Sequence, residues 1–229
     1  MTGTKYLVSI DPGMSTGITV GSYSDTDPYT LLNAYQIEGG VEGFLEFVDV
    51  RDGETFPDEK YYTCVSFGKP FTEGGSSYYL VEEVFQECEW QADTRCDEDE
   101  DGSKHQCYDT FVTSPTTVVA EKFTARGSGN AFSYRTNALE PLRIEGALLA
   151  LGLEPSWQYP QNMYFMVPSG FKGNKKSLAH KWLKDNGLYV SPKDVGCKDA
   201  DDVRSSILHA LVYMRKIGHK PTMERYFGR

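Results

Sequence analysis

Four carboxylate residues, Asp11, Glu121, Asp199 and Asp202, have the side-chain type and the positions that metal-dependent chemistry requires. Asp11 follows an apolar run at residues 6–10, and Glu121 closes the run TVVAE, where a carboxylate without a partner is costly. Asp199 and Asp202 are three residues apart at the start of an expected helix, so both should project from one face, with Asp201 pointing elsewhere. Carboxylates that are brought together cannot all remain ionised unless cations neutralise them.

The chemistry that such a cluster supports is that of hard divalent cations. Oxygen ligands favour Mg²⁺, or Mn²⁺ in its place, over Zn²⁺. Two such ions flanking a phosphodiester can activate water and stabilise the leaving oxygen. Each residue alone also has an ordinary structural interpretation, because an aspartate before Pro-Gly is typical of a turn and Asp199 or Asp202 alone is typical of a helix cap. The hypothesis therefore depends on the four residues occurring together.

The segments that would position these carboxylates predict an α/β protein. Three short runs rich in β-branched and apolar residues, at 6–10, 17–22 and 31–37, predict an antiparallel meander. Further strands are expected at 117–123 and 162–167, and helices at 41–50, 137–151, 177–186 and 199–216. We interpret the chain as a single domain over residues 1–229 with an insertion at about residues 52–115.

The insertion is distinguished by its charge. Of the net charge of −10, residues 52–110 contribute −12 (16 acidic and 4 basic side chains), whereas the remainder has 19 basic and 17 acidic residues, a net charge of +2. The total charge argues against a nucleic-acid partner, but this distribution leaves room for a local basic surface that binds one.

The cysteines bear on metal binding and on location. Cys88, Cys96, His105 and Cys107 could together hold a structural zinc ion in the insertion, but their spacing lacks a C-x-x-C pair, so free thiols are the expected state. Five cysteines, an odd number, favour a reduced, cytoplasmic protein. We expect neither a signal peptide nor a transmembrane segment.

Three segments in order, SIDPGMSTGITVG, VVAEKF and DADDVRSSILHAL, resemble the RuvC-type Holliday-junction resolvases of the RNase H-like superfamily. The resemblance covers about 160 of the 229 residues and leaves the insertion unmatched. It implies an RNase H-like mixed five-stranded sheet flanked by helices, with Asp11, Glu121, Asp199 and Asp202 as catalytic and metal-binding residues. It further implies a Mg²⁺-dependent endonuclease acting on four-way DNA junctions. The unmatched insertion indicates a divergent member, of the kind a phage encodes, which would act in the host cytoplasm.

The resemblance also implies partners and supporting residues. The family acts as a homodimer, for which the apolar face between Leu139 and Leu151 is the expected interface. Its members often have an aromatic residue just after the catalytic glutamate, where this chain has Phe123 two residues on. Basic residues in loops, which could contact phosphates, complete the expected DNA-binding set: Arg126, Lys172, Lys175 and Lys176.

Two other classes of protein stay open at this point. An actin-like or sugar-kinase-like phosphotransferase also begins with a strand, Asp-x-Gly and a second hairpin strand, but it needs a second such domain, which this chain lacks. A non-catalytic DNA-binding module of the same fold is the third class, and the presence of all four carboxylates argues against it.

Overall fold

The computed structural model describes residues 3–47, 63–68, 78–87, 106–124 and 139–228, and between residues 63 and 115 it describes secondary structure only. The chain forms two compact units, one made of Met1–Glu46 with Thr116–Arg229 and the other of Phe47–Pro115. All four of the carboxylates identified in the sequence lie in the first unit.

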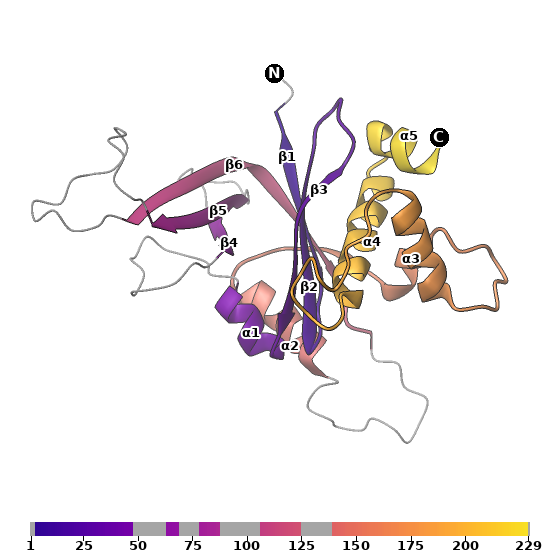
Figure 1. The fold of residues 1–229 in the computed structure, drawn as a ribbon, viewed down its shortest axis with the longest axis horizontal. Helices are drawn as coiled ribbons and strands as arrows, with labels where there is room; N and C mark the ends of the chain where they lie inside the picture. Colours follow the sequence, from indigo (N-terminus) through magenta and orange to yellow (C-terminus); the bar gives the residue numbers. More distant parts are fainter. Residues whose placement is uncertain (1–2, 48–62, 69–77, 88–105, 125–138, 229) are drawn as a thin grey trace, which may run out of the picture. The chain divides into compact units, whose positions relative to one another are not determined.

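A five-stranded mixed sheet with the order β3-β2-β1-β6-β7 is the centre of the first unit (Figure 1). Its strands are β1 (Lys5–Asp11), β2 (Ser15–Tyr23), β3 (Thr30–Glu38), the last residues of β6 (Gln106–Glu121), and β7 (Ser156–Gln158). The first three strands form the predicted antiparallel meander. β6 pairs in parallel with β1 on one side and with β7 on the other.

Helices flank this sheet, so the expected α/β class is confirmed. They are α1 (Gly40–Phe47), α2 (Glu140–Ala150), α3 (Lys175–Asp185), α4 (Asp201–Lys216) and α5 (Lys220–Phe227). Figure 1 shows α1 and α2 on one side of the strands and α3 and α4 on the other. The short helix α5 was not predicted from the sequence.

The core of the first unit fixes the orientation of α4. Ile207, Leu211 and Met214, at helical spacing of three and four residues, are fully buried against the sheet. They share a core with Leu7 of β1 and Val119 of β6. Because this apolar stripe determines which face of α4 meets the sheet, it also determines which residues of the first turn lie beside the ends of the strands.

Two expectations from the sequence are wrong. Residues 162–167 do not form a strand, because the fifth strand is Ser156–Gln158 and a 3₁₀ helix, η2 (Pro160–Tyr164), follows it. Pro160 lacks an amide hydrogen and favours a helical start, and a short apolar run does not distinguish a strand from a helical turn by its periodicity. The last long helix begins at Asp201, two residues later than expected.

The second unit contains strands β4 (Thr63–Gly68) and β5 (Tyr78–Glu87), which pair antiparallel, and the first part of β6. The sequence was compatible with either a strand or a short helix at residues 77–85. Residues 78–85 belong to strand β5, and residue 77 lies outside the described residues. Within the described ranges of both units, no helix is both long enough and apolar enough to cross a membrane.

Candidate active site

Asp11 and Glu121 end two neighbouring parallel strands at the same edge of the sheet. Ile10 of β1 pairs with Ala120 of β6, so the next residue of each strand is a carboxylate. The sequence placed both residues at strand ends, and the structure brings these two ends side by side.

Asp202 reaches the same edge from the first turn of α4. The approach is close because Gly17, the antiparallel partner of Asp11, faces the backbone of Asp202. Gln36 of β3 then holds the side chain: its Nε2 donates to Oδ2 of Asp202 at 2.8 Å, and its Oε1 accepts from the amide of Val203 at 3.2 Å. Three distant parts of the chain thus supply carboxylates to one place.

The electrostatics of Asp11 reflect this crowding. Burial raises the pKa of Asp11 well above its usual range, and the charges of Glu121 and Asp202 raise it further. A hydrogen bond from Ser205 and the charge of Lys176 act in the opposite direction without overcoming the rise. An acid whose ionised form is disfavoured by neighbouring carboxylates is typical of functional sites.

Asp202 is affected in the same direction. Burial raises the pKa of Asp202, although hydrogen bonds from Gln36 and Ser15 and the charge of Lys176 oppose the rise, and Asp199 adds a smaller repulsion. Asp11 and Asp202 are therefore two carboxyl groups whose charge the surroundings tolerate poorly.

Glu121 has a different partner. Its Oε2 lies 2.8 Å from Nε2 of His209, a side chain of α4 that is completely buried, while 19% of the Glu121 side chain is exposed. Glu121 thus joins the sheet edge to the middle of α4.

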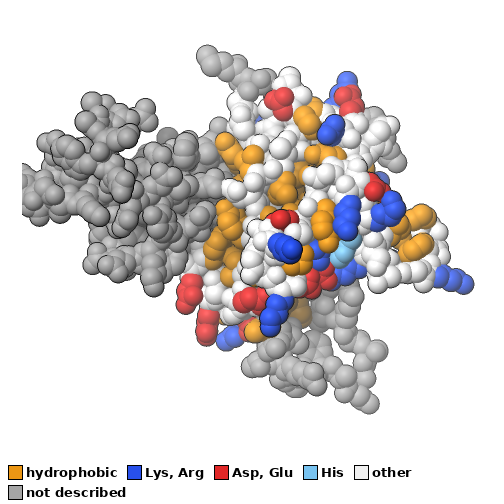
Figure 2. Space-filling model, in the orientation of Figure 1, with side chains coloured by type: hydrophobic (Ala, Val, Ile, Leu, Met, Phe, Trp, Pro, Cys, Tyr) orange, Lys and Arg blue, Asp and Glu red, His pale blue; other side chains and the backbone are white. Residues whose placement is uncertain are grey.

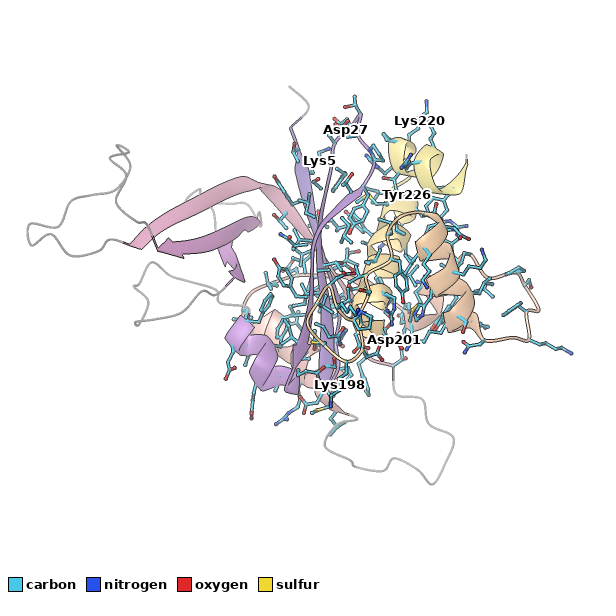
Figure 3. All side chains as sticks on the ribbon, viewed as in Figure 1. Lys5, Asp27, Lys198, Asp201, Lys220 and Tyr226 are labelled. Carbon is cyan, nitrogen blue, oxygen red and sulfur yellow. The ribbon has the colours of Figure 1, made fainter. Side chains whose placement is uncertain are left out.

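Asp201 points away from these carboxylates, as expected. Its carboxylate pairs with Lys176 of α3 and with Arg204 of α4, and lies 3.6 Å from Nε2 of His180. Burial alone would raise the pKa of Asp201, but the hydrogen bonds from Lys176 and Arg204 outweigh it and lower the pKa to about 2. Figure 3 labels Asp201 at the end of α4 opposite α5, and Figure 2 shows basic side chains gathered beside acidic ones on this view of the molecule.

Asp199 precedes α4, and its carboxylate contacts the backbone at the start of that helix. Its Oδ1 accepts from the amides of Ala200 and Asp201 at 2.7 and 3.0 Å, and it also lies 3.1 Å from the guanidinium of Arg204. Its side chain is 65% exposed. Because it lies outside the helix, the helical spacing that we expected to align it with Asp202 does not apply.

A group of three or more His, Cys, Asp or Glu side chains arranged to hold one metal ion is absent from the part of the chain that the structure describes. The donor set nevertheless suits a hard cation in charge and chemistry. The negative charges of Glu121 and Asp202 repel the ionised carboxylate of Asp11. A cation bound near the three side chains would relieve this repulsion. Of the residues considered for zinc, Cys88, Cys96 and His105 lie outside the described ranges, and Cys107 is described only as part of β6.

The expected DNA-binding residues are distributed around α3 and the end of β6. Lys172 is exposed in the loop before α3, and Lys175 and Lys176 open that helix. Phe123 lies two residues beyond β6 and is partly buried. Arg126 lies outside the described residues.

Four residues that contact Asp11, Glu121 or Asp202 were not predicted: Ser15, Gln36, Ser205 and His209. Their signals are weak, since serine and glutamine are common in strands and helices. His209 has a clearer sequence signal, because it interrupts the apolar run ILHALV, and the structure buries it completely.

Comparisons with protein-family models, with curated proteins and with solved structures found no match for this chain.

Proposed function

We propose that this protein is a magnesium-dependent, structure-selective endonuclease of the RNase H-like fold that cuts branched DNA such as four-way junctions. The observation that carries the proposal is the convergence of Asp11, Glu121 and Asp202 at one edge of the sheet, where burial and the two neighbouring carboxylates raise the pKa of Asp11. Such a set of groups suits divalent cations better than any reaction that needs a single acid or base.

The sheet supports the fold assignment. An antiparallel meander of three strands, continued by two strands parallel to the first, agrees with the mixed five-stranded sheet that the resemblance implies. Because fold alone does not determine function, the proposal depends on the carboxylates rather than on the sheet.

In the proposed site, the carboxylates bind the cation and a basic side chain contacts the DNA. Asp11, Glu121 and Asp202 would hold the cation, with Asp199 close to Asp202 as a fourth carboxylate. A bound Mg²⁺ would supply the activation of a water molecule and the stabilisation of the leaving oxygen. Lys172 is exposed and forms no ion pair with another described residue, so it would be available for a phosphate of the substrate.

The proposal includes a homodimer, in which two sites would nick two strands of a junction. α2 offers a surface for this contact, because Ile144 and Leu148 pack into the unit while Leu142 and Leu149 stay 47% and 52% exposed. Sedimentation of the protein at micromolar concentration tests this part, and a monomer both alone and on junction DNA would contradict it.

The test of the activity is incubation with labelled four-way, three-way, flap and linear DNA in Mg²⁺ or in EDTA. We expect cleavage of branched substrates in Mg²⁺ only. A Mn²⁺ soak of crystals, with anomalous density between Asp11 and Glu121, would distinguish this enzyme from a non-catalytic module, and binding of ATP without DNA cleavage would instead favour a phosphotransferase.

A further inference from the structure

Within the part of the chain that the structure describes, the completely buried His209 makes one hydrogen bond, and its partner is a proposed metal ligand. Its Nε2 lies 2.8 Å from Oε2 of Glu121. Its second ring nitrogen, Nδ1, is buried without a partner in the described part of the chain. Nδ1 therefore does not hold the ring in the core through a hydrogen bond to a described residue. The bond from Nε2 to Glu121 is the contact that explains a polar ring at this buried position.

The position of His209 on α4 links it to the other carboxylates. Asp202, Ser205 and His209 have the spacing i, i+3 and i+7, so they lie on one face of the helix. Asp202 is itself one of the three carboxylates, Ser205 donates a hydrogen bond to Asp11, and His209 contacts Glu121. A single helix face therefore contacts or supplies every member of the cluster.

The bond also determines which oxygen of Glu121 is engaged. A carboxylate only accepts hydrogen bonds, so Nε2 of His209 is the donor and Oε2 the acceptor. With Oε2 held, the other oxygen, Oε1, is the one left to bind a cation. Groups that orient metal ligands in this way commonly change metal affinity or activity by 10- to 100-fold when they are replaced.

We infer that His209 is a positioning residue: it fixes Oε2 of Glu121 and so presents Oε1 to a divalent cation shared with Asp11 and Asp202. This inference rests on the proposed function and deepens it. Helix α4 would then both carry Asp202 and orient Glu121 through His209.

Two substitutions with the same functional group test the inference. In His209→Gln the amide nitrogen can reach the position of Nε2, whereas in His209→Asn the same amide is one methylene shorter and falls short of Glu121. Ser206→Ala is the matched structural control, because Ser206 is fully buried on the same helix and contacts Thr19 at 3.2 Å instead of a carboxylate.

Three measurements are made on each full-length variant: the melting temperature as a function of Mn²⁺ concentration, the affinity for a four-way junction in EDTA, and the single-turnover cleavage rate in Mg²⁺. For His209→Asn we expect the half-saturating Mn²⁺ concentration to rise and the cleavage rate to fall by about tenfold or more, with junction affinity within about twofold of wild type. His209→Gln should recover most of both losses. Ser206→Ala should lower the melting temperature in EDTA without changing its response to Mn²⁺.

The inference is overturned if His209→Asn responds to Mn²⁺ like wild type or like Ser206→Ala, or if His209→Gln is no better than His209→Asn. In those cases a wild-type protein that binds Mn²⁺ and cuts junctions leaves the proposed function standing. A wild-type protein that is not stabilised by Mn²⁺ and cuts no DNA removes the proposed function, and the inference with it.

Discussion

Gly17 lies so close to Asp202 that a Cβ atom on Gly17 would be 2.1 Å from the carbonyl carbon of Asp202. The backbone of β2 and the first turn of α4 are therefore in direct contact. Since Gly17 pairs with Asp11 across the hairpin, this contact determines how near Asp202 comes to Asp11. Only a residue without a side chain allows it.

Gly17→Ala should therefore damage both folding and the site. The methyl group would meet backbone, which cannot turn aside as a flexible side chain can, so we expect a loss of about 2–3 kcal/mol in the free energy of unfolding. Cleavage should fall at least tenfold even at temperatures where the variant is folded. Chemical denaturation followed by a cleavage assay measures both effects.

Gly146→Ala is the control for the effect of that substitution on stability. Its cleavage rate is not compared, because Gly146 lies at helical spacing from Leu142 and Leu149 on the α2 surface proposed for the dimer. Gly146 lies in α2, where an added Cβ meets nothing within 4 Å, so alanine should be neutral or stabilise the helix by up to about 1 kcal/mol. An equal change in the free energy of unfolding in the two variants would show that the contact between β2 and α4 does not contribute to stability.

Asp11→Asn should stabilise the protein while abolishing cleavage. Burial and the charges of Glu121 and Asp202 raise the pKa of Asp11, so the ionised group opposes folding at neutral pH. Removing it should increase the free energy of unfolding by about 1–2 kcal/mol at pH 7 in the absence of metal. Thermal melts in EDTA measure the change. A clear destabilisation of Asp11→Asn would show that the ionised carboxylate of Asp11 does not oppose folding.

The raised pKa of the Asp11 carboxyl group also predicts that the stability of the protein depends on pH. The folded protein holds the Asp11 proton to higher pH than the unfolded chain, so stability should fall as pH rises from the usual aspartate range through the raised pKa. This component should be missing in Asp11→Asn. Identical pH profiles of the two proteins would contradict it.

The strands that carry Asp11 and Glu121 could be predicted because they depend on local sequence. The ends of β1 and β6 follow from apolar runs that stop at Asp11 and Glu121, and the meander follows from short β-branched segments with turns between them. What local sequence does not contain is the partner of each carboxylate. Gln36, for example, contacts Asp202 from 166 residues away along the chain.

The position of Asp199 could not be predicted from residue spacing alone. Three-residue spacing predicts a shared helix face only if both residues are helical, and Asp199 instead accepts hydrogen bonds from amides at the helix start. The Asp199 carboxylate also pairs with the buried Arg204, five residues further along in α4, so its contacts at the helix start are local ones that compete with continuing the helix.

Asp199→Asn should consequently be milder than Asp202→Asn. Asp199 is exposed and pairs with Arg204, whereas Asp202 is partly buried and close enough to Asp11 for its charge to raise the pKa of Asp11. We expect a loss in cleavage rate of less than about tenfold for Asp199→Asn and of at least about a thousandfold for Asp202→Asn. Single-turnover rates at saturating Mg²⁺ decide this, and equal losses would return Asp199 to the set of essential ligands.

Asp201→Asn should act mainly on stability. Hydrogen bonds from Lys176 and Arg204 hold the pKa of Asp201 at about 2, so its stabilising contribution is complete above the usual aspartate range and is lost as pH falls towards 2. We expect a loss of about 1–2 kcal/mol at pH 7, allowing for solvent screening of this partly exposed group. The difference between wild type and variant should shrink below pH 3, and a difference that grows there would contradict the ion-pair explanation.

The decisive experiment for the proposed nuclease activity is the single-turnover cleavage of a labelled four-way junction by wild type and Glu121→Gln, with binding of the same junction measured in EDTA. We predict that wild type cuts the junction in Mg²⁺ and not in EDTA, and that Glu121→Gln binds it with unchanged affinity but cuts it at least about a thousandfold more slowly. A wild-type protein that leaves the junction intact in Mg²⁺ would contradict the proposed nuclease activity, and a Glu121→Gln variant that cuts it at the wild-type rate would contradict the proposed role of Glu121.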